Sequence, residues 1–317
     1  MAKIDKQNQV FASKNKAIQM KENIIKGLLV SAAAISILTT FGILFSILFE
    51  AIEFFKLRSF MYFLTGTEWS PGTPNSQFGA MPIFVGTFVI TAIAMAVAIP
   101  VGLFSAIYMS EYASSKGRTI IKPLLEILAG IPTVVYGFFA AITVAPFIVN
   151  VCASIGLDAS FNSALASGIV MGIMIIPVIS SLSDDVISAV PDSMRKGSLA
   201  LGMTKAETIK NIVLPSAMPG IISASLLGVS KALGETMIVV MAAGMNANKL
   251  SINPLEDMTT VTVQIVTALT GDFEFDSPDT LSAFALGLVL FIVTLILNIV
   301  SVSMIRKFKE KYKMSNL

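Results

Sequence analysis

The sequence predicts an all-α membrane protein with six transmembrane helices, and three observations support this fold class. Apolar residues make up 55% of the 317 positions and charged residues only 13%, about half the charged share of a soluble domain. Uncharged apolar runs long enough to cross a hydrocarbon core of roughly 30 Å recur along the chain. Lysine and arginine are concentrated in alternate connections between these runs. We therefore expect a chain that crosses the membrane repeatedly.

The chain begins with a polar, basic tail over residues 1–26, whose composition suggests disorder. The apolar run that follows is longer than the core of a cleaved signal peptide, so we expect a retained first helix. One membrane domain then covers residues 27–305, and a basic tail covers 306–317. The expected spans of the membrane domain cover roughly residues 27–49, 82–108, 124–148, 161–183, 217–244 and 281–304.

The distribution of cations predicts the orientation of these spans. Of the 22 lysines and arginines, 18 lie in the N-terminal tail, the connection after the second span, the connection over residues 184–215 and the C-terminal tail. The intervening connections together hold three. Since cytoplasmic loops carry the excess of lysine and arginine, both termini and the 184–215 connection are expected to be cytoplasmic.

The segment Met258–Thr270 is apolar on average but short and rich in threonine. If it crossed the membrane, the basic C-terminal tail would lie outside. We therefore expect a short external or re-entrant helix here. Acidic residues cluster around this segment, where they could contact another protein or simply remain solvated.

Several chemistries are excluded by residues that the sequence lacks. A single cysteine, Cys152, leaves no internal disulfide and no cysteine metal cluster. Histidine is absent, which removes histidine-based catalysis, metal binding and proton relay. The phosphate-binding pattern Gly-x4-Gly-Lys-Ser/Thr does not occur, so the chain cannot hydrolyse ATP through such a loop. We expect no enzyme activity, no cofactor, no metal and no nucleic-acid partner, with lipid as the surrounding medium.

A polar and basic island, Pro191–Pro215, separates two long apolar runs. Asp192 or Ser193 could cap a first short helix. Gly202 could end it, because glycine readily adopts the left-handed conformation found at helix termini.

A second helix is expected directly afterwards. Thr204 stands three residues before Glu207, the spacing of a capping box, and Pro215 would end the helix. The island therefore predicts a helix-turn-helix hairpin, either an ordinary solvated loop or a docking element for a soluble partner.

Four positions of this island resemble the loop signature of ABC-importer permeases, Gly-x9-Ile-x-Leu-Pro. Gly202, Ile212, Leu214 and Pro215 match it at the same spacing. The resemblance implies the fold of a type I permease bundle and a coupling helix that docks into a groove on a cytoplasmic ATPase. Lys196 stands where the family's loop has an acidic residue, which reverses the charge offered to the ATPase.

Two charges lie inside the expected fifth span. Lys231 and Glu235 are four residues apart and share a helix face, so they could form a structural ion pair. Alternatively, Lys231 could attract a passing oxyanion while Glu235 limits how tightly it is held. Ser230 and Thr236 could add hydroxyl donors to such a path.

The segment "SKALGETM" around these charges resembles "GRALGETM" of PstC-type phosphate permeases, with lysine in place of arginine. "QFGAMPIFVGT" from Gln77 and "GIPTVVYGF" from Gly130 are similar to further segments of that family. The resemblance implies a PstA-like homologue as heterodimer partner, two copies of an ATPase and an external phosphate-binding protein. Import of another oxyanion, such as molybdate or sulfate, and ATP-independent secondary transport remain the alternatives.

Overall fold

The computed structural model describes the backbone of residues 2–247, 250–270 and 276–313, and the side chains in these ranges except those of residues 2–18, 20 and 308–313. Within the described part, six helices are long and apolar enough to cross a membrane, as the sequence predicts. These helices cover Lys21–Leu57, Met81–Tyr112, Thr133–Ser154, Ala164–Ser188, Lys205–Leu233 and Pro278–Lys307.

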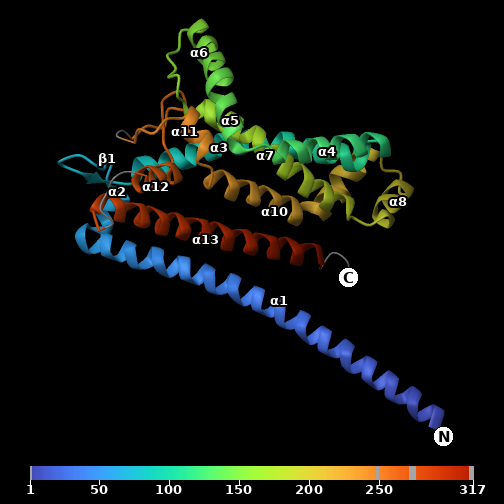
Figure 1. Ribbon diagram of the computed structural model, residues 1–317. Coiled ribbons are helices and arrows are strands. Elements are labelled where there is room, and N and C mark those ends of the chain that lie inside the picture. The colour runs from blue at the N-terminus through green and yellow to red at the C-terminus, as the bar shows by residue number, and fades with distance from the viewer. Residues whose placement is uncertain (1, 248–249, 271–275, 314–317) are drawn as a thin grey trace.

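The first and last helices run side by side (Figure 1). Helix α1 covers Ala2–Leu57 and α13 covers Pro278–Lys313. The polar residues 2–26, expected to be disordered, are the first part of α1. This difference has a local reason, because the segment contains no glycine or proline to interrupt a helix. Most apolar side chains of α1 between Ile24 and Phe49 are exposed, as suits a helix that faces lipid.

A small cap closes one end of the bundle. It contains α2 (Phe60–Thr65) and the antiparallel strands β1 (Trp69–Ser70) and β2 (Gln77–Phe78). Six aromatic rings pack edge to face here, those of Phe54, Phe55, Phe60, Phe63, Trp69 and Phe78. The buried Trp69 Nε1 also donates to Gln264 Oε1 at 2.9 Å. Gln264 lies on α12 (Val261–Leu269), which confirms a short helix inside the 258–270 segment.

The centre of the bundle is the packing of α3 (Met81–Ile107) against α7 (Ala164–Ser188). Two glycines of α7, Gly168 and Gly172, lie directly on α3. A Cβ atom at Gly168 would stand 2.7 Å from the Cβ of Ile93, and one at Gly172 would stand 2.8 Å from the carbonyl oxygen of Ala94. Only glycine permits this approach, so the Gly-x3-Gly spacing of the sequence serves helix packing.

The third span differs from its expected bounds of 124–148. Helix α4 (Ser115–Gly130) ends before Pro132, and the spanning segment follows as α5 (Thr133–Phe139), the π-helical turn η2 (Ala140–Val144) and α6 (Ala145–Ser154). Ile131 is extended, with φ −65° and ψ 129°, as is typical of the residue before a proline. Proline thus separates α4 from the span, and α6 points away from the neighbouring helices in Figure 1.

The fifth span also differs, at both ends. Pro215 does not end the helix that begins after Thr204. Helix α9 (Lys205–Thr208) continues through the π-helical turn η3 (Ile209–Val213) into α10 (Leu214–Leu233). The wider turn, closed by a hydrogen bond from the Leu214 amide to the Ile209 carbonyl, accommodates the proline ring inside a continuous helix.

At its other end α10 stops at Leu233, and the short helix α11 (Met237–Ala242) follows after a break. The expected span 217–244 is therefore two helices.

Ion pairs join α4 to α7 at the opposite end of the bundle from the aromatic cap. Arg118 contacts the buried Asp184 at 2.8 Å, and Lys122 contacts Asp185 at 2.8 Å. The hydrogen bond to Asp185 raises the pKa of Lys122 above its ordinary value, which favours the charged form of this lysine. Helix α8 (Asp192–Ala200) lies at this same end, toward which both α1 and α13 carry the chain termini (Figure 1).

Candidate functional site

The polar island forms the expected hairpin of two helices, α8 and α9. Gly202 takes φ +87°, a conformation that side chains with a Cβ rarely adopt. The Gly202 amide donates to the Leu199 carbonyl at 3.0 Å, and the Met203 amide donates to the Ser198 carbonyl at 3.2 Å. These two bonds form a Schellman motif, which confirms that Gly202 ends the first helix.

The predicted capping box at the start of α9 is present. The Thr204 amide donates to Glu207 Oε2 at 2.8 Å, and the Glu207 amide donates to Thr204 Oγ1 at 3.3 Å. Each residue thereby satisfies a backbone donor of the other. The predicted cap of α8 is wrong, because Pro191 occupies the N-cap position and neither Asp192 nor Ser193 supplies a side-chain cap there.

The two helices of the hairpin are held together from inside. The hydroxyls of Ser198 and Thr208, both buried, are 2.8 Å apart. On the outside, Leu199 and Leu201 are 50% and 84% exposed, and Lys196 is exposed beside them. The hairpin therefore exposes two leucines with the Lys196 cation close to them in the chain, at the end of the bundle where α8 lies.

The remaining positions of the loop signature face less solvent. Ile212, Leu214 and Pro215 are half-buried where η3 joins α10. They position the hairpin on the bundle and do not extend its exposed apolar surface.

A second predicted site lies at the break after α10. Gly234 caps α10, and the buried Glu235 accepts hydrogen bonds at Oε1 from the amides of Met237 and Ile238, at 3.0 and 3.3 Å. Thr262 of α12 donates to the Glu235 carbonyl at 2.9 Å. The Glu235 carboxylate thus caps the start of α11 by accepting hydrogen bonds from backbone amides.

Of the two alternatives for Lys231 and Glu235, the ion pair is not formed. Within the described residues, Lys231 makes no ion pair and no side-chain hydrogen bond, although its side chain is half-buried. The pair fails because α10 ends between the two residues, which removes the helical spacing that would align them. Lys231 lies instead in the last turn of α10, where the helix dipole favours a cation.

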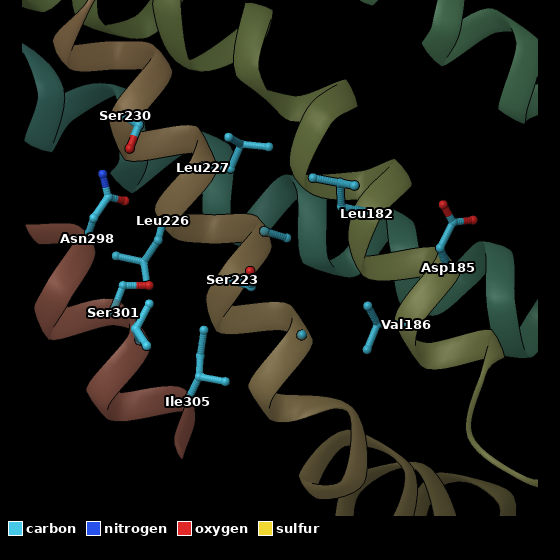
Figure 2. A pocket seen from close by; sticks show the side chains of 13 residues that line it. Leu182, Asp185, Val186, Ser223, Leu226, Leu227, Ser230, Asn298, Ser301 and Ile305 are labelled. Atoms are coloured by element: carbon cyan, nitrogen blue, oxygen red, sulfur yellow. The ribbon is translucent and has the colours of Figure 1, made fainter. Parts of the chain in front are cut away.

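The four residues predicted for a substrate path share one segment but not one surface. Ser230 lines a cavity of about 520 Å³ between α7, α10 and α13, while Lys231 is not among the lining residues and Thr236 is half-buried at the start of α11. Figure 2 shows Ser230 near Asn298 of α13, with Ser301 one turn further along. Asn298 and Ser301 are polar residues in an apolar run, and this pattern could have identified them from the sequence as residues that line a cavity.

Sequence reasoning also missed the residues that hold the hairpin in place. Arg195 of α8 forms an ion pair with Glu111 at 2.9 Å, and both side chains are largely buried. Glu111 lies in the π-helical turn η1 (Tyr108–Tyr112), which directly follows α3. A carboxylate at the end of a long apolar run was the available signal.

Among the described residues, six long apolar helices with a structured polar hairpin at one end define a multi-pass membrane protein. Comparison with known proteins gives the family. The model of the binding-protein-dependent transport system inner membrane components matches residues 98–313, and the chain belongs to this family.

Individual relatives agree with this assignment. The chain is 35% identical over 232 residues to the probable ABC transporter permease protein YqgH of Bacillus subtilis, covering 73% of each protein. It is 32% identical over 288 residues to the phosphate transport system permease protein PstC 1 of Mycobacterium tuberculosis, covering 81% of this chain and 85% of the relative. A bacterial alginate ABC transporter, solved with its alginate-bound periplasmic protein, shares the fold with a TM-score of 0.59 and 15% identity over 90% of this chain and 96% of that one.

Proposed function

We propose that this chain is a permease subunit that moves inorganic phosphate across the cell membrane, in a complex driven by ATP hydrolysis in a separate subunit. The observation that carries this proposal is the similarity to the Mycobacterium tuberculosis phosphate permease over 85% of that protein's length. A match of this extent includes the break after α10, where Lys231 supplies a cation without a competing partner among the described residues.

The proposed complex contains three further kinds of protein. A PstA-like permease homologue would form a heterodimer with this chain, and two copies of an ATPase would bind on the cytoplasmic side. An external phosphate-binding protein would deliver the substrate. The family name, which refers to binding-protein-dependent transport, supports the last of these partners.

The hairpin α8–α9 would be the docking element for the ATPase, with Lys196, Leu199 and Leu201 at the contact. This assignment places both termini in the cytoplasm, because α1 and α13 carry them to the same end of the bundle as α8 (Figure 1). The excess of lysine and arginine at this end supports the same orientation. ATP binding would close the ATPase dimer, move the hairpin and switch the bundle between its inward-facing and outward-facing states.

Uptake of radiolabelled phosphate into proteoliposomes that contain the chain and its candidate partners tests this function. We expect uptake that requires ATP inside the vesicles and the binding protein outside them. Excess unlabelled phosphate should abolish uptake of the label, whereas molybdate and sulfate should not.

Two outcomes would overturn the proposal. Stronger competition by molybdate or sulfate would assign the complex to another oxyanion. Uptake driven by an ion gradient in the absence of ATP would make the protein a secondary transporter.

A further inference from the structure

A carboxylate at the end of the second span is tied to the hairpin. Glu111 of η1 is only 9% exposed and Arg195 of α8 only 17%. The Nε and Nη2 atoms of Arg195 both donate to Glu111 Oε1, at 3.0 and 2.9 Å. Such shielding from water makes the pair much more sensitive to loss of one partner than a surface ion pair would be.

The same guanidinium also binds the end of α7. Arg195 donates to the backbone carbonyl of Ile187 at 2.8 Å and to that of Val190. One side chain therefore connects α8, the end of α3 and the end of α7. Arginine suits this role because its planar group offers five donors in fixed directions.

The other helix of the hairpin contacts the same turn. Lys205 of α9 donates to the backbone carbonyl of Glu111, and its ammonium lies 4.6 Å from the ring centre of Tyr112. Both α8 and α9 thus hold η1. Since α3 and α7 are in close contact along their length, a displacement of the hairpin reaches both helices together.

We propose that Glu111 is the positioning residue through which the hairpin moves the second span, so that α8, α3 and α7 move as one body. This inference rests on the proposed docking of an ATPase on the hairpin. Without the carboxylate, the hairpin would keep the contact of Lys205 with the η1 backbone but lose the ion pair of Arg195. The end of α3 would then follow the hairpin incompletely, and much of the ATP would be hydrolysed without transport.

A distance measurement in the assembled complex tests this rigid connection directly. Spin labels would be placed at Tyr108 of η1 and Ser193 of α8, both exposed, in a chain with Cys152→Ser. The distance between the labels should stay constant when ATP is added to the complex. With Glu111→Ala it should change or broaden on ATP addition, and a change already present with Glu111 intact would overturn the proposal.

A functional measurement separates positioning from folding. In proteoliposomes, Glu111→Ala should lower the ratio of phosphate transported to ATP hydrolysed by about tenfold or more, within the range typical of coupling between sites. Glu111→Gln, which keeps an acceptor oxygen, should fall between this variant and the wild type. Glu126→Ala, an exposed glutamate of α4, is the matched control and should leave the ratio unchanged.

The two proposals fail in different ways. Absence of phosphate uptake by the wild type would refute the proposed substrate, while the label distances would still decide the role of Glu111. Normal coupling in Glu111→Ala, in a complex whose wild type transports phosphate, would refute the role of Glu111 alone.

Discussion

Glu235 directs its carboxylate to the backbone amides that begin α11, and not to Lys231 four residues earlier. The two charges therefore have separate roles. Glu235 stabilises the break between α10 and α11, and Lys231 keeps an uncompensated positive charge beside that break. A cation held in this way is available to an anion, because no neighbouring carboxylate among the described residues neutralises it.

Independent roles predict additive effects on stability. Glu235→Gln should lower the free energy of unfolding by about 1 kcal/mol through loss of the charged cap, whereas Lys231→Gln should change it by less than about 0.5 kcal/mol. The double variant should equal the sum of the single variants within about 0.5 kcal/mol. Thermal unfolding in detergent, followed by the reaction of the buried Cys152 with a fluorescent thiol probe, measures all three. An interaction energy well above that limit would show that the side chains pair.

Phosphate uptake should depend strongly on Lys231, although the free energy of unfolding should not. Loss of a charged donor to an oxyanion costs about 1.5–3 kcal/mol, so Lys231→Gln should weaken phosphate uptake by roughly 10- to 100-fold. Lys231→Arg keeps the charge and should retain most of the uptake. Concentration-dependent uptake in proteoliposomes checks both variants. Unchanged uptake in Lys231→Gln would remove this residue from the anion path.

Much of the fold could be predicted from the sequence because the membrane demands long apolar runs. Each of the six expected spans corresponds to a long apolar helix in the part of the chain that the structure describes, and the spacing of three residues between Thr204 and Glu207 correctly predicts their capping box. Local spacing is sufficient when the interaction itself is local. The bounds of the third and fifth spans were wrong because prolines act differently by context. Pro132 separates two helices, whereas Pro215 lies within one helix after a π-helical turn.

The candidate site was less predictable, for a physical reason. Glu111 and Arg195 lie far apart in the chain, and nothing in either segment alone indicates that they meet. Likewise, the helical spacing of Lys231 and Glu235 predicts a pair only if the helix continues. Gly234 ends α10 between them, and a lone glycine in an apolar run does not by itself indicate a break.

Gly202 offers a test of the hairpin's geometry. Its φ of +87° is strained for a residue with a β-branched side chain, so Gly202→Val should distort the turn at a cost of about 1–3 kcal/mol. ATP-driven uptake should fall while the chain remains in the membrane, as measured by uptake and membrane fractionation. Gly197→Ala is the matched control in the same hairpin, since a Cβ there meets no atom within 4 Å. Normal uptake in Gly202→Val would contradict a coupling role for the hairpin.

The capping box gives a second, graded test. Thr204→Ala removes the acceptor hydroxyl and should destabilise the start of α9 by about 1 kcal/mol. Thr204→Ser keeps a hydroxyl and should remain within about 0.5 kcal/mol of the wild type. Amide hydrogen exchange of residues 204–208 measures this local stability directly. Equal exchange rates in the alanine and serine variants would show that the hydroxyl does not stabilise the helix.

Substitutions in the ion pairs between α4 and α7 should lower the free energy of unfolding by amounts that follow the burial of the carboxylate. Asp184 is fully buried, whereas its partner Arg118 is 36% exposed. Arg118→Ala would leave the buried carboxylate with the Lys122 ammonium at 3.7 Å and the Ser188 hydroxyl at 3.4 Å, and should lower the free energy of unfolding by about 3 kcal/mol. Asp184→Ala leaves cations that water can reach and should cost less, about 1–2 kcal/mol. Asp185→Ala, 57% exposed, is the matched control and should cost about 0–1 kcal/mol. Thermal unfolding measures the order, and a larger effect for Asp185→Ala than for Arg118→Ala would mean that burial does not govern these pairs.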